Sequence, residues 1–221
     1  MTKTGLFRLL KEKEIFMNII TISREFGSGG REIGKRLADA LGYAYYDKEI
    51  EIGIARRMNM DENFIAGAID RGVTANIPLH FGRTIANSYA MKQQVDILVE
   101  KQRVLEEFAT ASDCVIVGRA ADVILSEYEP LKIFVYADME YKINRCQGYA
   151  EVGENPTRRE MEKAIKKIDS GRMKYHSMFL DADWGDKRHY HLCVNTSGIE
   201  IKKIVPAIAQ YARCWFDNQN K

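Results

Sequence analysis

Short apolar runs alternate along the chain with longer stretches in which apolar residues recur at helical spacing. The first run, Ile19 to Ile22, is continuous, which is typical of a strand buried on both faces of a parallel sheet. The run at residues 114–117 is a second buried strand of this kind, and residues 43–46, 131–136 and 191–195 are predicted to form three further strands. Strands that alternate with helices in this way predict an α/β fold, a three-layer doubly wound parallel sheet.

The first predicted helix follows the first strand after a glycine-rich turn. Its apolar face is formed by Ile33, Leu37, Ala38 and Leu41. Gly42 is suited to end this helix in a left-handed conformation. The strand at residues 43–46 comes next, so strand, helix and strand form a βαβ unit, for which we expect a right-handed crossover.

Most of residues 48–112 is predicted to be helical, and the longest helix in this region carries an apolar stripe. The stripe is formed by Val95, Leu98, Val99, Gln102, Leu105 and Phe108. A charged helix is predicted after Pro156, because Thr157 and Glu160 have the spacing of a capping box. Residues 199–216 are predicted to form the last helix.

The composition is that of an ordinary globular domain, with 46% apolar and 29% charged residues in a chain of 221. We therefore expect one domain, residues 17–221. The formal net charge of +2 provides no long-range field that would attract nucleic acid or a membrane surface. Any anion site must therefore be local.

The four cysteines are Cys114, Cys146, Cys193 and Cys214. They lie too far apart for a metal-binding or redox pair, so buried free thiols in a reducing cytoplasm are the simplest interpretation. No apolar run approaches the roughly 20 residues of a membrane span. We expect a cytoplasmic protein with small-molecule partners and with neither a nucleic-acid nor a membrane partner. A homodimer is left open.

Residues 1–16 mix apolar residues with Arg8, Lys11 and Lys13, and suit an amphipathic helix. They lack the cleavage site and the clean apolar core of a signal peptide. Met17 stands directly before the first strand. We expect this segment to be a loosely held N-terminal extension, or the product of a start assigned upstream of the true one.

The turn Gly27-Ser28-Gly29-Gly30 connects the first strand to the first helix. Glycines let backbone N–H groups converge on a phosphate at a helix N-terminus, where the helix dipole also favours anions. The alternative is a tight strand-to-helix turn without a ligand. A literal P-loop match begins at Gly29, but Arg36 stands where that motif needs a hydroxyl residue. We interpret Gly34 as a packing residue.

Two side chains are predicted at the carboxyl edge of the sheet, where open α/β folds bind ligands. Arg119 follows the strand at 114–117, and Asp47 follows the strand at 43–46. Each suits a ligand-binding residue, and the alternative for each is a structural ion pair. The dense charge of residues 158–174 suits either a solvated helix face or a functional segment.

Several blocks of the sequence resemble cytidylate kinases. The segment from Ile20 to Asp47 is similar to the opening of that family without gaps. Further similar blocks are Gln102-Arg103, Val115 to Arg119, Leu131 to Phe134 and Asn195 to Gly198. The pattern from Ser23 to Gly34 is closer still to the cytidylate kinase-like proteins, and the resemblance covers Met17 to Tyr211. It implies a P-loop nucleoside monophosphate kinase-like fold, with a helical acceptor-binding insertion at 48–112 and a lid at 150–190.

The resemblance also implies an activity, the ATP-dependent and Mg²⁺-dependent phosphorylation of a small phosphorylated acceptor. A pyrimidine nucleoside monophosphate such as CMP is the first choice. The residues implied for the nucleotide cofactor are Arg24, Gly27, Ser28, Gly29, Gly30 and Arg31. Those implied for the acceptor are Asp47, Gln102, Arg103, Arg119 and Asp122. Those implied for catalysis are Arg31, Arg119, Arg145, Asp169 and Arg172.

The phosphate loop departs from the family pattern at three positions. The family's phosphate-binding lysine is Gly30 here, its hydroxyl residue is Arg31, and its first loop glycine is Arg24. We predict that Arg31 replaces the lysine, with Arg24 as the second choice. The alternative account of Arg31 is a surface ion pair with Glu32 or Asp47.

The same departures affect the metal and the activity. No residue is assigned as a direct metal ligand, and Mg²⁺ is expected to be held through water near Ser28 or Asp47. The altered loop also supports a different function, a catalytically weak or inactive nucleotide-binding protein that acts as a sensor or interaction partner.

Overall fold

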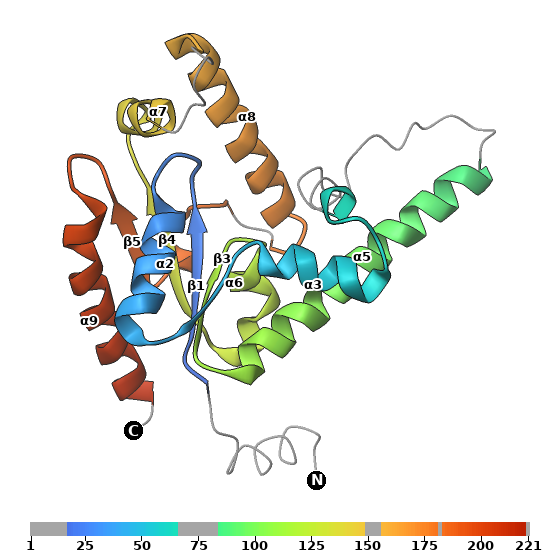
Figure 1. Ribbon diagram of the computed structural model, residues 1–221, viewed down its shortest axis with the longest axis horizontal. Coiled ribbons are helices and arrows are strands. Elements are labelled where there is room, and N and C mark those ends of the chain that lie inside the picture. The colour runs from blue at the N-terminus through green and yellow to red at the C-terminus, as the bar shows by residue number, and fades with distance from the viewer. Residues whose placement is uncertain (1–16, 66–83, 149–155, 181–182, 220–221) are drawn as a thin grey trace.

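The computed structural model describes residues 17–65, 84–148, 156–180 and 183–219 (Figure 1). The predicted N-terminal extension, residues 1–16, lies outside these ranges. Residues 66–83 of the predicted insertion and 149–155 and 181–182 of the predicted lid also lie outside them.

Five parallel strands form one sheet in the order β2-β3-β1-β4-β5. The strands are β1 Ile19–Arg24, β2 Ala44–Tyr46, β3 Cys114–Val117, β4 Leu131–Tyr136 and β5 Leu192–Asn195. All five predicted strands are therefore confirmed, and β2 and β5 begin one residue later than the pattern indicates. Since β1 lies at the centre of the sheet, the turn that follows β1 opens at the middle of its carboxyl edge.

Helices cover both faces of the sheet. They are α2 Gly30–Leu41, α3 Glu49–Met58, α5 Thr84–Ala111, α6 Ala121–Ile124, α7 Met139–Gln147, α8 Arg158–His176 and α9 Ile201–Gln219. In the described ranges, short 3₁₀ helices span Ser126–Tyr128 and Lys187–His189. The capping box of Thr157 and Glu160 at the start of α8 is confirmed, because each side chain bonds the backbone N–H of the other residue.

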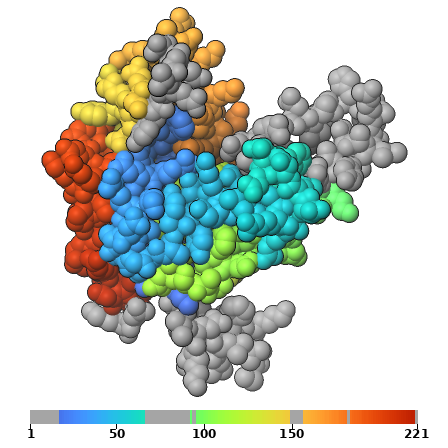
Figure 2. All heavy atoms as spheres, in the orientation of Figure 1, coloured from blue at the N-terminus to red at the C-terminus, as the bar shows by residue number. Residues whose placement is uncertain are grey.

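The sheet separates two apolar cores. On one face, α2 and α9 pack against the sheet, and on the other face α3 and α5 do so. Successive residues of β3 alternate between them, since Val115 contributes to the first core and Ile116 to the second. The space-filling view shows α9, α2 and α3 next to one another across one side of the molecule (Figure 2). The predicted three-layer fold is confirmed.

The predicted apolar stripe of α5 is wrong in part. Leu105 is buried as expected, but Val95 and Val99 are 49% and 43% exposed. The buried face instead includes Val104 and Lys101, which is fully buried. A lysine at this position breaks the apolar pattern in the sequence, so the periodicity indicates a face rotated away from the true one.

The four cysteines are free, as expected, but they are not all buried. Cys114 is buried, Cys146 and Cys193 are half-buried, and Cys214 is exposed. The expectation of buried thiols therefore holds for Cys114 alone. In the described part of the chain, no helix combines the length and the apolar character that crossing a membrane requires.

Candidate functional site

The turn between β1 and α2 has the geometry of an anion-binding loop. Gly27 and Gly29 have φ angles of 77° and 82°, in the left-handed region that other residues seldom adopt. The Ser28 hydroxyl donates to the Glu25 carbonyl at 2.8 Å, and the Thr196 hydroxyl donates to the Ser28 carbonyl at 2.7 Å. The N-cap residue of α2 is Gly29, which has no side chain to cap the helix, so the helix dipole and first amides face the loop.

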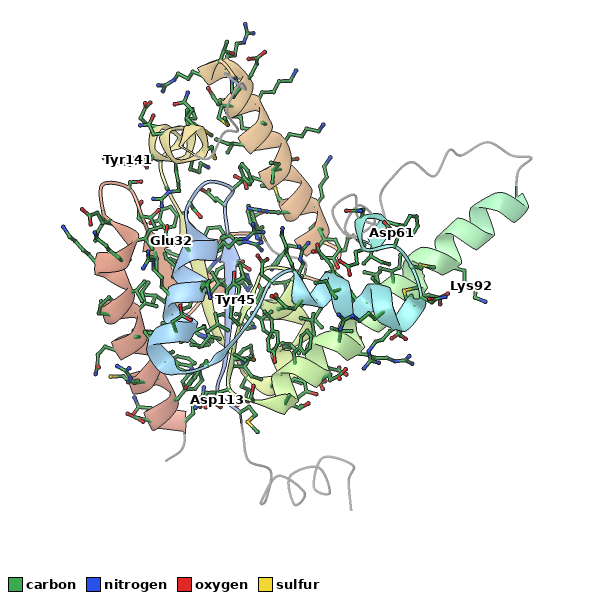
Figure 3. All side chains as sticks on the ribbon, in the orientation of Figure 1. Glu32, Tyr45, Asp61, Lys92, Asp113 and Tyr141 are labelled. Atoms are coloured by element: carbon green, nitrogen blue, oxygen red, sulfur yellow. The ribbon has the colours of Figure 1, made fainter. Side chains whose placement is uncertain are left out.

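A cavity of about 820 Å³ opens beside this loop. Glu32 of α2 and Tyr45 of β2, both labelled in Figure 3, line it, together with Gly27, Gly29, Gly30 and Arg31 of the loop. Arginine is its most frequent charged lining residue. The lining arginines are Arg24, Arg31, Arg36, Arg145 and Arg172. With Lys35 and Lys48, seven basic side chains line the cavity against five acidic ones, and this excess of positive charge favours an anionic ligand.

Two glycines leave room for the Arg24 side chain, Gly30 beside its Cβ and Gly118 beside its guanidinium. A Cβ atom on Gly30 would lie 2.5 Å from the Arg24 Cβ, and one on Gly118 would lie 1.4 Å from its Nη1. The side chain is 11% exposed, and its Nη2 lies 3.6 Å from Oδ1 of Asp47. Burial, followed by the charge of Arg172, lowers the pKa of Arg24 to about 9, which leaves it positively charged at neutral pH.

Arg31 forms an ion pair with the same carboxylate. Its Nε lies 2.5 Å from Oδ2 of Asp47, while the Arg31 side chain is 59% exposed. The pairing with Asp47 that the sequence offered as an alternative is therefore present in the structure. The buried carboxylate of Asp47 therefore faces both Arg24 and Arg31, and the Glu49 carboxylate accepts a hydrogen bond from the Asp47 backbone N–H at 2.9 Å.

Helix α8, in the predicted lid, contacts the loop directly. Asp169 Oδ1 accepts a hydrogen bond from the Phe26 backbone N–H at 2.7 Å, and Arg172 Nη1 donates to the Arg24 carbonyl at 3.0 Å. Burial raises the pKa of Asp169. Lys142 of α7 lies 2.9 Å from the Glu25 carboxylate and 3.6 Å from that of Asp169. The structure thus brings Asp169 and Arg172 to the loop.

Arg145 of α7 also reaches the loop. A Cβ atom on Gly29 would lie 2.7 Å from its Nη1, and the same nitrogen is 3.9 Å from a Glu32 carboxylate oxygen. Arg145 therefore lies against both the loop and the first turn of α2, and it lines the cavity.

Arg119 and Asp122 lie in a second group beside the cavity rather than in its lining. Gly118, Arg119 and Ala120 have φ angles of 76°, 61° and 53°, so two L-residues adopt the left-handed region in succession. Arg119 forms an ion pair with Glu51 of α3. The carboxylate of Asp122 is buried and lies 2.9 Å from Nε2 of His176.

Gln102 and Arg103 lie on the exposed side of α5. The Gln102 amide donates to Glu106 at 2.9 Å, and Arg103 is 2.5 Å from Glu100. Neither residue lines the cavity. The structure therefore does not bring this pair to the loop.

Sequence reasoning missed Lys142, Thr196 and Lys101. The Asn195-to-Gly198 block contained Thr196, but nothing in the sequence shows that its hydroxyl holds the Ser28 carbonyl. Lys142 is one of many lysines on charged helices, and only its burial distinguishes it. Lys101 has the same character, and no local pattern indicates a buried amine.

Magnesium usually keeps several waters and binds one or two carboxylates together with substrate phosphates. Asp47 fits this role, because its buried Oδ1 has no hydrogen-bond partner among the described residues. The Ser28 hydroxyl is already bonded to Glu25, so it fits only an indirect role. Among the described residues, no group of three or more His, Cys, Asp or Glu side chains could hold a metal ion on its own.

A parallel sheet in the order β2-β3-β1-β4-β5, with a glycine-rich loop between the central strand and α2, defines a P-loop kinase-like fold. Residues 19–198 match the cytidylate kinase-like family, and the chain belongs to that family. Membership indicates a kinase-type phosphotransferase that uses nucleotides.

The relatives are distant in sequence. A cytidylate kinase from Haloarcula marismortui is 25% identical over 179 residues, which cover 81% of each protein. One from Saccharolobus islandicus is 21% identical over 197 residues, 87% of this chain and 89% of that protein.

Among solved structures, an uncharacterized protein from Eubacterium ventriosum has a TM-score of 0.63 at 25% identity, covering 89% of this chain and 99% of the other. A shikimate kinase from Bacteroides thetaiotaomicron has a TM-score of 0.52 at 13% identity, covering 91% and 99%, and shows the shared fold alone.

Proposed function

We propose that this protein transfers the γ-phosphoryl group of ATP to a nucleoside monophosphate, with CMP as the first candidate. The observation that carries the proposal is the arginine-lined cavity at the phosphate loop. The names of the curated relatives, cytidylate kinases that align over most of their length, support the choice of acceptor.

The protein's part in this reaction is positioning and charge compensation. The β- and γ-phosphates of a nucleotide carry about three to four negative charges, whereas the amides at a helix end supply only about half a unit charge. Arg24 supplies a fixed buried cation below the loop, close to where the family has its lysine. Arg31 and Arg172 supply two further cations at the rim of the cavity.

Phosphoryl transfer breaks the bond from the γ-phosphorus to the β–γ bridging oxygen and forms a bond to an acceptor phosphate oxygen. ADP leaves, and the acceptor becomes a nucleoside diphosphate. When bound, Mg²⁺ neutralises charge on the β- and γ-oxygens, and Asp47 would hold it. Arg172 and Arg145 lie where they can stabilise the charge of the transferring group, and Asp169 fixes the Phe26 amide of the loop.

The second candidate is a nucleotide-binding protein without turnover. The observation that favours it is the loss of both the lysine and the hydroxyl residue, together with the engagement of Arg31 by Asp47. In this account the arginines bind the phosphates but do not stabilise the transition state.

The experiment that separates the two candidates measures product formation from ATP and Mg²⁺ with a panel of nucleoside monophosphates. The proposed kinase should give a turnover of about 1–100 s⁻¹ with its true acceptor. Absence of turnover with every acceptor, together with nucleotide-induced thermal stabilisation, would support the second candidate. Ligand at about 100 times its dissociation constant adds about 2.7 kcal/mol, which a melting experiment resolves.

A further inference from the structure

A buried lysine joins the phosphate loop to helix α8. Lys142 belongs to α7, which lies beside α8 (Figure 1). Its ammonium nitrogen is 2.9 Å from the Glu25 carboxylate and 3.6 Å from that of Asp169. Glu25 directly follows β1, whereas Asp169 belongs to α8. One ammonium group therefore balances carboxylates from two separate elements.

Each of these carboxylates also holds a backbone N–H group. Asp169 accepts a hydrogen bond from the Phe26 N–H at 2.7 Å, and Glu25 accepts one from the Ala137 N–H at 3.3 Å. Phe26 directly precedes the glycine turn and lines the cavity, while Ala137 lies between β4 and α7. The network thus ties α8 to the backbone of the loop, and ties the loop to the segment that begins α7.

The backbone that carries the ammonium group is fixed against the loop. A Cβ atom on Gly27 would lie 2.9 Å from the Lys142 backbone oxygen and 3.2 Å from the Lys142 Cα. Because Gly27 lacks that atom, α7 packs directly on the loop backbone. Lys142 therefore cannot follow α8 if that helix moves away from the loop, and its bond to Asp169 would break.

The balance of charge around Asp169 depends on this lysine. Among the described residues, the charged or titratable groups that face Asp169 are Glu25 beside the loop, Lys142 and Cys146 of α7, and Arg172 of α8. Burial raises the pKa of Asp169, and the charge of Glu25 acts in the same direction. Loss of the ammonium group would leave two carboxylates near one another without the cation that both of them contact.

We propose that Lys142 is a positioning residue that holds α8 against the phosphate loop in the arrangement that phosphoryl transfer requires. The proposal rests on the proposed function. Lys142 acts through Asp169, which keeps the Phe26 amide of the loop in place. It also keeps near the loop the part of α8 that carries Arg172, which lines the cavity. Lys142 itself does not line the cavity, so it acts without touching a phosphate.

The first test needs no turnover. It measures hydrogen exchange of the Phe26 amide by NMR, residue by residue, in the full chain at one pH. In Lys142→Met this amide should exchange about tenfold faster than in the wild type, and the increase should exceed that of the β1 amides, which report global unfolding. Lys142→Arg keeps the charge and should keep most of the protection. The matched control is Lys163→Met, which removes an exposed lysine of α8 and should leave the rate unchanged.

The second test measures turnover with ATP, Mg²⁺ and the acceptor that the panel identifies. At pH 8, Lys142→Met should lower kcat by about tenfold or more and change the KM for ATP less, because the loss concerns groups that serve the transition state. The loss should shrink as the pH falls to 6, since a proton shared by Glu25 and Asp169 then replaces the missing cation. Lys142→Arg should restore part of kcat. A lysine that only stabilises the fold would lower the melting temperature without this pH dependence.

The two tests separate this proposal from the proposed function. If no acceptor is phosphorylated, the proposed function fails, and faster exchange confined to the Phe26 amide still supports the link that Lys142 makes. The proposal is overturned if Phe26 exchange in Lys142→Met rises no more than that of β1, or if kcat is unchanged or reduced equally at pH 6 and pH 8. If Lys142→Met does not fold, Asp169→Asn decides, because it removes the charge that Lys142 holds, and an unchanged Phe26 exchange rate refutes the idea.

Discussion

Arg24→Gly and Gly30→Lys, alone and together, test whether the Arg24 side chain occupies the place of the lysine that the family has at position 30. Gly30→Lys alone would put a Cβ 2.5 Å from the Arg24 Cβ, closer than real Cβ atoms approach. The contact is with the first side-chain atom and not a flexible tip, so the backbone must move. Arg24→Gly removes that atom together with the guanidinium, and makes room for a side chain at position 30.

The expected magnitudes differ between the two single variants. Overpacking costs about 1–3 kcal/mol. At about 2–4 °C per kcal/mol for a domain of this size, Gly30→Lys should lower the melting temperature by about 2–12 °C. Arg24→Gly should weaken nucleotide binding by about ten- to hundredfold, since a hydrogen bond to a charged group contributes about 1.5–3 kcal/mol. In the double variant, both losses should be smaller than the sum of the single losses.

The assay is a double-mutant cycle with two readouts, the melting temperature without ligand and the dissociation constant for ATP. Gly30→Ala is the matched control, because it adds the clashing Cβ without a charge and should lose thermal stability to a similar extent. The reasoning is refuted if Gly30→Ala and Gly30→Lys both melt like the wild type. It is also refuted if the double variant binds ATP no better than Arg24→Gly.

Two further predictions concern single side chains. Arg31→Ala should weaken ATP binding or turnover by about tenfold. The control is Arg57→Ala, which removes an exposed arginine outside the cavity and should change neither quantity. If an ATP titration shows equally small effects for both variants, Arg31 is not part of the site. In the unfolded chain Lys101 keeps its proton up to about pH 10.5, whereas the folded chain releases it at a lower pH. The free energy of unfolding of the wild type, relative to that of Lys101→Met, should therefore rise with pH. The slope should be about 1.4 kcal/mol per pH unit between the lowered folded pKa and 10.5. Urea unfolding of both proteins at a series of pH values checks this, and a flat difference contradicts it.

The fold could be predicted because its three central strands, β1, β3 and β4, are buried on both faces. A run such as Cys114 to Val117 is continuously apolar because helices cover both sides of the sheet, so the buried runs of β1, β3 and β4 indicate the layers directly. The face of α5 was mispredicted for the converse reason. A periodicity argument counts a lysine as polar and therefore exposed. Lys101 is instead buried against Tyr175, a residue 74 positions away in the chain.

The site could be predicted only as far as the backbone determines it. The glycine turn and the positions of Asp47 and Arg119 after their strands follow from local spacing and from the carboxyl-edge rule. The partners of these residues do not. The bond between Asp169 and the Phe26 amide joins residues 143 positions apart, and no local pattern in the sequence reports such a contact.

The phosphate loop shows why a motif and a site can differ. A sequence motif records which residue type stands at which spacing, whereas a bound phosphate responds to where charge lies in space. Position 30 carries no side chain here, and the missing atoms would collide with the Cβ of Arg24. The guanidinium of Arg24 instead extends past Gly30 and against Gly118, where only a glycine leaves room for it. Glycines at 30 and 118 and arginine at 24 therefore form one arrangement, and we expect substitutions at any of the three to depend on the other two.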